Sequence, residues 1–166
     1  AEMAHVFGME VNAFDPYVSA DQTDELDYIM HDDVDSLFGA CTHISVHCNL
    51  SEDTHHLVNR ERLAMMPDIG ADGTACGSHI VNCARGGIVD ESAVLDALDS
   101  GVLSSAALDV FEVEPAIGNL LLQHERFHGS PHIGAATLEA HNRVGTEMTG
   151  LLVAFFNGER PKSAIN

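Results

Sequence analysis

The chain has 166 residues, of which 45% are hydrophobic, so it is long enough to bury the core of one globular domain. Its 26 acidic and 7 basic residues give a formal net charge of -19, which disfavours nucleic acids and anionic membranes as partners. The acids are scattered along the chain instead of forming a disordered tail, and Lys162 is the only lysine. Concentrated salt would screen the repulsion among these acids, so we expect a halophilic origin.

The cysteines and histidines bear on compartment and metal binding. The 4 cysteines form no CxxC pair, and the sequence shows neither a signal peptide nor an apolar run near membrane-spanning length. We therefore expect a reducing, cytoplasmic location. His43, His47 and Cys48 lie close together, but strand alternation would turn Cys48 away from the two histidines, so we expect no metal site.

Short apolar runs alternate with helical patterns along the chain, which is typical of parallel βα units. The expected strands cover residues 9–14, 28–30, 43–47, 79–83, 105–110 and 126–130. The first expected helices cover residues 21–26, 34–40 and 59–66. The pattern predicts an α/β fold with a doubly wound parallel sheet.

Capping residues mark two further helices. Asp90 is the expected N-cap of a helix that runs to about Ser100, where Gly101 stops it. Thr137 is the expected N-cap of a long helix that ends at Gly158. Apolar residues recur in this helix at intervals of three and four, which predicts that one face packs in the core. They are Leu138, Val144, Met148, Leu151, Leu152 and Phe155.

Three polar residues come at or just beyond the ends of predicted strands. They are Arg85 in the run 82–87, Glu114 before a proline, and His132 after a proline. Taken singly, each has an ordinary structural explanation, such as a surface ion pair, a solvated loop acid or a structural histidine. Together they predict a ligand crevice, because the carboxyl ends of parallel strands meet at one edge of the sheet.

The order of these segments resembles that of the D-2-hydroxyacid dehydrogenases over nearly the whole chain. The resemblance implies a Rossmann-type domain and hydride transfer between NAD and the substrate carbon. His132 would be the acid/base, and Glu114 would hydrogen-bond it and favour its charged form. Arg85 would bind the substrate carboxylate in a forked grip.

The resemblance also implies how the cofactor is held. Asp15 would accept hydrogen bonds from the adenosine ribose and repel a 2′-phosphate, which favours NAD over NADP; a turn-forming aspartate before proline is the alternative. Asp109 would accept a hydrogen bond from the nicotinamide carboxamide, whereas Glu112 is expected to be solvated. Further cofactor contacts are implied for Cys48, Cys83, Ala84, Arg85, His132, Gly134 and Ala135.

The sequence departs from the family pattern at three places. None of the 14 glycines forms a G-x-G-x-x-G loop, so we expect the chain to begin inside the following helix. Asn49 replaces a usual proline. Residues 66–78 form a longer turn than usual, which we expect to be a solvated insertion at the amino end of its strand.

The expected domains follow from these departures. Residues 1–157 would be a partial dinucleotide-binding domain, and residues 158–166 the start of the return to a substrate domain. The fragment alone would be inactive, and the full-length protein would be a homo-oligomer, most simply a dimer.

Within the family, the segments 82–87, 112–115 and 163–166 most resemble the members that oxidise 3-phosphoglycerate to 3-phosphohydroxypyruvate in serine biosynthesis. The alternatives are a glyoxylate or hydroxypyruvate reductase, which would share the three catalytic residues, and a dehydrogenase-like corepressor that senses NAD(H). In either enzyme, the partner is a small 2-hydroxy or 2-keto acid.

Overall fold

The computed structural model describes residues 2–18, 28–161 and 164. The chain divides into a first unit, Ala1–Pro131, and a second unit, His132–Asn166.

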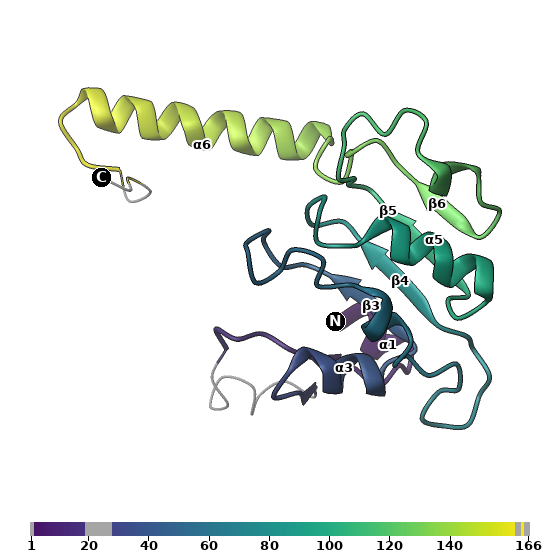
Figure 1. The fold of residues 1–166 in the computed structure, drawn as a ribbon. Helices are drawn as coiled ribbons and strands as arrows, with labels where there is room; N and C mark the ends of the chain where they lie inside the picture. Colours follow the sequence, from purple (N-terminus) through teal and green to yellow (C-terminus); the bar gives the residue numbers. More distant parts are fainter. Residues whose placement is uncertain (1, 19–27, 162–163, 165–166) are drawn as a thin grey trace. The chain divides into compact units, whose positions relative to one another are not determined.

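Parallel strands form the framework of the first unit (Figure 1). Strands β3 (His43–Val46), β4 (His79–Asn82), β5 (Ser105–Leu108) and β6 (Phe127–Gly129) form one sheet in that order. Strands β1 (Asn12–Ala13) and β2 (Ile29–Met30) form a separate parallel pair. Every pairing between these strands is parallel, as the alternating pattern predicts.

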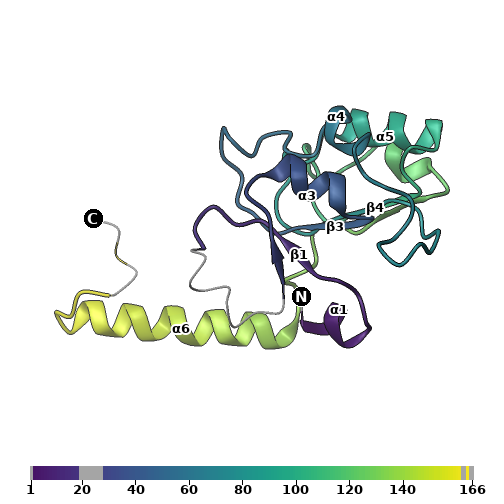
Figure 2. The ribbon, with the colours of Figure 1, turned by 90° about the horizontal axis from the view of Figure 1, so that it is seen from below.

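Helices follow the strands and cover one side of them. These helices are α3 (Val34–Ala40), α4 (Arg60–Leu63) and α5 (Glu91–Ser100), and Figure 2 shows all three on the same side of β3 and β4. Among the described residues of this unit, the remaining elements are α1 (Glu2–Val6) and the 3-10 helix η1 (Leu120–Gln123). The parallel sheet with covering helices confirms the predicted α/β fold class.

Side-chain caps set the helix boundaries. Asp90 accepts a hydrogen bond from the backbone N–H of Ala93, and Gly101 ends α5 with a left-handed φ of 80°. Both boundaries were predicted. Helix α4 is shorter than its predicted range of 59–66, because Asn59 is its N-cap and Ala64 is its C-cap. Residue 66 also precedes a proline, a position that disfavours helical backbone.

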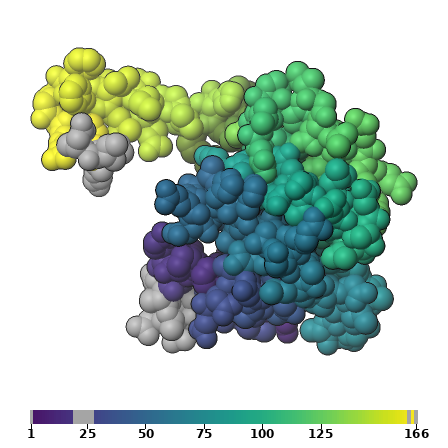
Figure 3. Space-filling view, viewed as in Figure 1, coloured from purple at the N-terminus to yellow at the C-terminus, as the bar shows by residue number. Residues whose placement is uncertain are grey.

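Apolar residues of the strands and helices form one core in the first unit. Its largest fully buried members are Phe38, Leu63, Ile80, Ile88, Leu98, Leu103, Leu108 and Leu121. In the space-filling view, the teal and green residues that carry most of this core form one continuous body (Figure 3).

The remaining strand predictions differ from the structure mainly in length. The run 9–14 is extended only at Asn12–Ala13, and the run 105–110 ends at Leu108. The helix predicted at residues 21–26 lies outside the described residues.

The insertion at residues 66–78 lies at the amino end of β4, as predicted. Ile69 and Ala75 form an isolated antiparallel bridge, and the Gly70 N–H donates to the Thr74 carbonyl at 2.8 Å. Most of its residues are exposed, but Ser78 is buried and donates its hydroxyl to the Val102 carbonyl at 2.7 Å.

The second unit contains α6 (Leu138–Phe156), which Thr137 caps as predicted. The prediction that its apolar face packs in the core is wrong, because α6 has no buried residue and Val144 is 62% exposed. A helical period identifies a face that can pack, but it does not identify what covers that face. Within the described residues, no helix is both long and apolar enough to cross a membrane.

Candidate functional site

The carboxyl edge of the sheet brings several predicted residues together. Cys48 follows β3, Cys83 and Arg85 follow β4, and Asp109 follows β5. Because β3, β4 and β5 are neighbouring parallel strands, the segments after them leave the sheet at the same edge.

The turn after β4 is held by a buried amide. Asn82 is 1% exposed; its Nδ2 donates to the Arg85 carbonyl at 3.0 Å, and its Oδ1 accepts from the Ala84 N–H at 2.9 Å. Asn82 therefore fixes the backbone on both sides of Cys83. The Arg85 side chain is exposed at the surface of this turn, and its Nη1 donates to the Ala84 carbonyl at 2.6 Å. The turn thus presents a guanidinium on a fixed backbone.

The turn after β4 also contacts the turn after β5. A Cβ placed on Gly86 would lie 1.8 Å from the Phe111 carbonyl oxygen and 2.4 Å from its carbonyl carbon. Only a residue without a side chain permits this backbone approach. The segments that carry Arg85 and Glu114 are therefore in direct contact.

Asp109 begins the segment after β5. It is 5% exposed, and its Oδ1 accepts a hydrogen bond from the Ser130 hydroxyl at 2.6 Å. Its N–H donates to the Asn82 carbonyl at 2.9 Å, which extends the β4–β5 pairing beyond the strands. The role of Ser130 was not predicted from the sequence, although a hydroxyl residue at the carboxyl end of the expected strand 126–130 was a usable signal.

Glu114 and Glu112 lie further along the same segment. Glu114 Oε1 accepts a hydrogen bond from the Phe111 N–H at 3.0 Å, so the Glu114 carboxylate closes a local turn. Glu112 is exposed, as expected, but it is also bonded, because its Oε1 lies 2.9 Å from His56 Nε2. Its N–H donates to Glu91 Oε1 at 2.6 Å. The roles of Glu91 and His56 here were not predicted from the sequence.

Asp15 and Cys48 have simple local environments. Asp15 is exposed just after β1, and its Oδ1 accepts from the Tyr17 N–H at 2.9 Å, which is the predicted turn alternative. This bond leaves the second carboxylate oxygen as an acceptor for a ribose hydroxyl. Burial raises the pKa of the Cys48 thiol, so Cys48 is a neutral, partly buried side chain.

His132, Gly134 and Ala135 belong to the second unit. His132 has a φ of 56°, an uncommon left-handed conformation for a residue with a side chain. All three residues are exposed, and they lie in the segment that leads to the Thr137 cap of α6. The nearby Ala136 N–H donates to the Ile133 carbonyl at 2.9 Å, which closes a turn.

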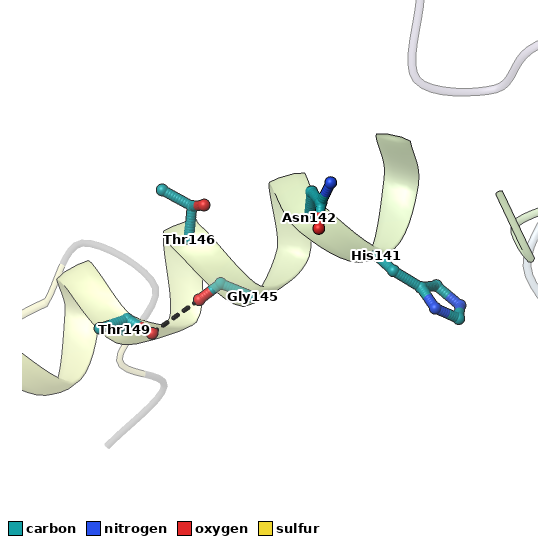
Figure 4. A pocket seen from close by; sticks show the side chains of 5 residues that line it. All are labelled: His141, Asn142, Gly145, Thr146 and Thr149. Atoms are coloured by element: carbon teal, nitrogen blue, oxygen red, sulfur yellow. Dashed lines mark hydrogen bonds between the residues drawn. The ribbon is translucent and has the colours of Figure 1, made fainter. Parts of the chain in front are cut away.

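A shallow hollow along α6 contains none of the predicted residues. It is lined by His141, Asn142, Gly145, Thr146 and Thr149 (Figure 4). The Thr149 hydroxyl donates to the Gly145 carbonyl of the preceding turn at 2.8 Å, so its polar group is already bonded. Among the residues with described positions, no three His, Cys, Asp or Glu side chains are grouped for metal binding.

Comparison with known proteins identifies the family. The family model of the D-isomer specific 2-hydroxyacid dehydrogenase NAD-binding domain matches residues 1–134. The chain belongs to this family.

Individual relatives agree with this family assignment. The chain is 37% identical over 166 residues to D-3-phosphoglycerate dehydrogenase of Bacillus subtilis, and the match covers all of this chain and 30% of the relative. It is 42% identical over 152 residues to hydroxypyruvate reductase of Thermotoga maritima, covering 89% of this chain and 45% of the relative. The chain therefore spans less than half the length of these two relatives.

A solved D-lactate dehydrogenase from Treponema pallidum has a similar fold. It matches with a TM-score of 0.82 and 30% identity, over 99% of this chain and 50% of the solved chain. This agreement confirms the Rossmann-like, NAD-binding fold class predicted from the sequence.

NAD is the cofactor of this family. Some residues of this chain have the chemistry to bind the ribose and nicotinamide groups of NAD. Asp15 and Asp109 offer carboxylate oxygens, which suit the hydroxyl and amide donors of a dinucleotide. The backbone of the turn at Cys83 and Ala84 is fixed by the two hydrogen bonds of Asn82. The pyrophosphate loop motif is not found among these 166 residues.

Proposed function

We propose that this chain is the NAD-binding part of an oxidoreductase that interconverts a D-2-hydroxy acid and its 2-keto acid. The observation that carries the proposal is the carboxyl edge of the sheet. There, Asn82 holds the turn that presents Arg85, and Gly86 packs that turn directly against the segment of Glu114.

Each proposed catalytic residue has a role that suits its chemistry. Arg85 would bind the substrate carboxylate and polarise the carbonyl oxygen, because its planar fork can donate two parallel hydrogen bonds. His132 would exchange the proton of the substrate hydroxyl, and Glu114 would hold its imidazole and favour the protonated form. NAD would supply or accept the hydride.

The proposed cofactor contacts are divided between the two ends of NAD. Asp15 would bind the adenosine ribose, and Asp109 would accept a hydrogen bond from the nicotinamide carboxamide. Ser130 supports the Asp109 role, since its hydroxyl occupies one oxygen of that carboxylate and fixes its orientation. The remaining proposed contacts are Cys48, Cys83, Ala84, Arg85, His132, Gly134 and Ala135.

For the substrate, we propose 3-phosphoglycerate, with 3-phosphohydroxypyruvate as its oxidised form. The support is the likeness to the Bacillus subtilis relative, which extends over the whole chain. Hydroxypyruvate is the second candidate. The Thermotoga maritima hydroxypyruvate reductase has a higher sequence identity to this chain than the Bacillus subtilis relative does, although over fewer residues. A dimeric state, a cytoplasmic location and halophily stay predictions.

The substrate proposal is tested by NADH oxidation with the native protein expressed from its complete gene. Three substrates are compared, namely 3-phosphohydroxypyruvate, hydroxypyruvate and glyoxylate. We expect kcat/KM for 3-phosphohydroxypyruvate to be at least tenfold higher than for the other two. A preference for hydroxypyruvate would favour the second candidate, and no turnover of any 2-keto acid would contradict the proposed function.

A further inference from the structure

We propose that Glu91 is a positioning residue that fixes where Glu114 lies relative to Arg85. Its carboxylate braces the segment 111–119, which carries Glu114, against the start of α5. The inference rests on the proposed function only in assigning catalytic roles to Arg85 and Glu114. The brace itself is a feature of the first unit.

The brace consists of two hydrogen bonds to one side chain. Glu91 is the first residue of α5 and is half-buried. Its Oε1 accepts from the Glu112 N–H at 2.6 Å, and its Oε2 accepts from Asn119 Nδ2 at 2.5 Å. Short bonds to an ionised carboxylate are the stronger class of hydrogen bond. One carboxylate therefore holds the segment at two separate points.

The segment between these points leads directly to Glu114. The Phe111 N–H donates to Glu114 Oε1 at 3.0 Å, so the position of Glu114 depends on the backbone next to Glu112. At the far end, Asn119 Oδ1 caps η1 by accepting from the Leu121 N–H at 3.0 Å. Both anchors of the segment are thus fixed. Glu91 holds Glu112, and Glu91 and η1 together hold Asn119.

Glu91 also begins the helix that directly follows the turn of Arg85. The turn of Arg85 runs through Gly86 to the Asp90 cap, directly before Glu91. Gly86 contacts the Phe111 carbonyl from one side, and Glu91 holds the Glu112 N–H from the other. The peptide between Phe111 and Glu112 is therefore clamped by the segment that presents the guanidinium. This clamp sets the spacing of the two proposed catalytic residues.

A simpler role for Glu91 is that of a negative charge at a helix N-terminus. Such a charge stabilises a helix by its attraction to the unpaired N–H groups of the first turn, and this does not require a particular direction of its two oxygens. The two roles differ in what they require. The brace needs two acceptor oxygens at full side-chain length, whereas the helix needs only the charge. Glu91→Gln keeps the length but leaves only one acceptor oxygen, and Glu91→Asp keeps the charge but shortens the reach.

Amide hydrogen exchange of the 166-residue chain tests the brace itself. The Glu112 N–H is followed in the unmodified chain, in Glu91→Gln and Glu91→Asp, and in the control Glu125→Gln, which changes an exposed glutamate elsewhere in the first unit. We expect exchange at least tenfold faster in both Glu91 variants and no change in the control. Asn119→Ala, which removes one donor and leaves the carboxylate intact, should give a smaller increase. Exchange within twofold of the unmodified chain in either Glu91 variant would overturn the brace.

Kinetics of the native protein test the positioning role. With 3-phosphohydroxypyruvate and NADH, both Glu91 variants should lower kcat at least tenfold and leave the KM for NADH within twofold. Their pH optimum for reduction should move to lower pH, because a misplaced Glu114 no longer favours the protonated form of the proposed acid/base, His132. A purely structural role would not move this profile.

The two measurements separate the possible failures. Faster exchange together with unchanged kcat and an unchanged pH profile would overturn the positioning role. No turnover by the unmodified native protein would instead contradict the proposed function, and the exchange rates would still decide whether Glu91 braces the segment.

Discussion

Gly86 and Phe111 come so close that no side chain fits at residue 86, where a Cβ would lie 1.8 Å from the Phe111 carbonyl oxygen. The approach joins the turns after β4 and β5, which carry Arg85 and Glu114. A backbone contact of this kind is rigid, because it leaves no flexible side chain that could adjust.

Gly86→Ala should therefore destabilise the chain. The added methyl group would overlap backbone atoms of Phe111, and we expect a loss of about 1–3 kcal/mol in the free energy of unfolding, the usual scale of overpacking. Urea unfolding followed by circular dichroism measures this. Gly39→Ala is the control, since a Cβ there meets nothing within 4 Å and alanine favours the helix α3. Equal stability of the two variants would contradict the close approach.

The pH dependence of stability should contain a contribution from His43. Its ring stacks on that of His79 with centroids 4.4 Å apart, and burial followed by the charge of His79 lowers the pKa of His43 below 6.5. A lowered pKa in the folded state means that the folded chain binds the proton less readily than the unfolded chain. The stabilising contribution is therefore present above pH 6.5 and is lost as the pH falls through the folded-state pKa of His43.

Unfolding at pH 8 and pH 5 tests this contribution. His43→Gln should lose less stability between the two pH values than the unmodified chain does. His128→Gln, which changes an exposed histidine of β6, is the control and should leave the difference unchanged. If all three chains lose the same stability between pH 8 and pH 5, His43 does not contribute to the pH dependence of stability.

Cofactor choice should depend on Asp15. Its carboxylate would accept ribose hydroxyl bonds and repel a 2′-phosphate, so Asp15→Ala in the native protein should lower kcat/KM for NADH and raise relative use of NADPH. The ratio of kcat/KM for the two cofactors should shift by at least tenfold. An unchanged ratio would mean that Asp15 serves only the turn that its bond to Tyr17 closes.

Added salt should stabilise the chain. With a net charge of -19, repulsion among carboxylates opposes the compact state, and salt screens that repulsion. We expect Tm to rise as KCl increases from dilute to molar concentration. A flat or falling Tm would refute halophilic adaptation as the reason for the acidity.

The features that were predictable from the sequence depend on neighbouring residues. Asp90 and Gly101 bound α5 as expected, because a cap bonds to backbone within its own turn. Strands β3 and β4 lie within the expected ranges 43–47 and 79–83, because a short apolar run is a local signal for a strand. The carboxyl-edge position of Arg85 then followed from the parallel order of the strands, whereas Asp109 lies at this edge because β5 ends at Leu108, before the end of the expected strand.

The features that were missed depend on residues far apart in the chain. Glu91 and Glu112 meet only because two loops follow particular paths, which no local pattern encodes. Asp109 and Ser130 meet for the same reason across neighbouring strands. The burial predicted for α6 failed because the helical period is the same whether a face is covered or exposed.

The most direct test of the central claim is the kcat of His132→Ala, measured in the native protein with 3-phosphohydroxypyruvate and NADH. Proton transfer by a positioned side chain contributes roughly a hundredfold or more, so kcat should fall by at least that factor. The control His141→Ala, which changes an exposed histidine on α6, should retain normal turnover. Near-normal kcat in His132→Ala would contradict the assignment of the reaction to this site.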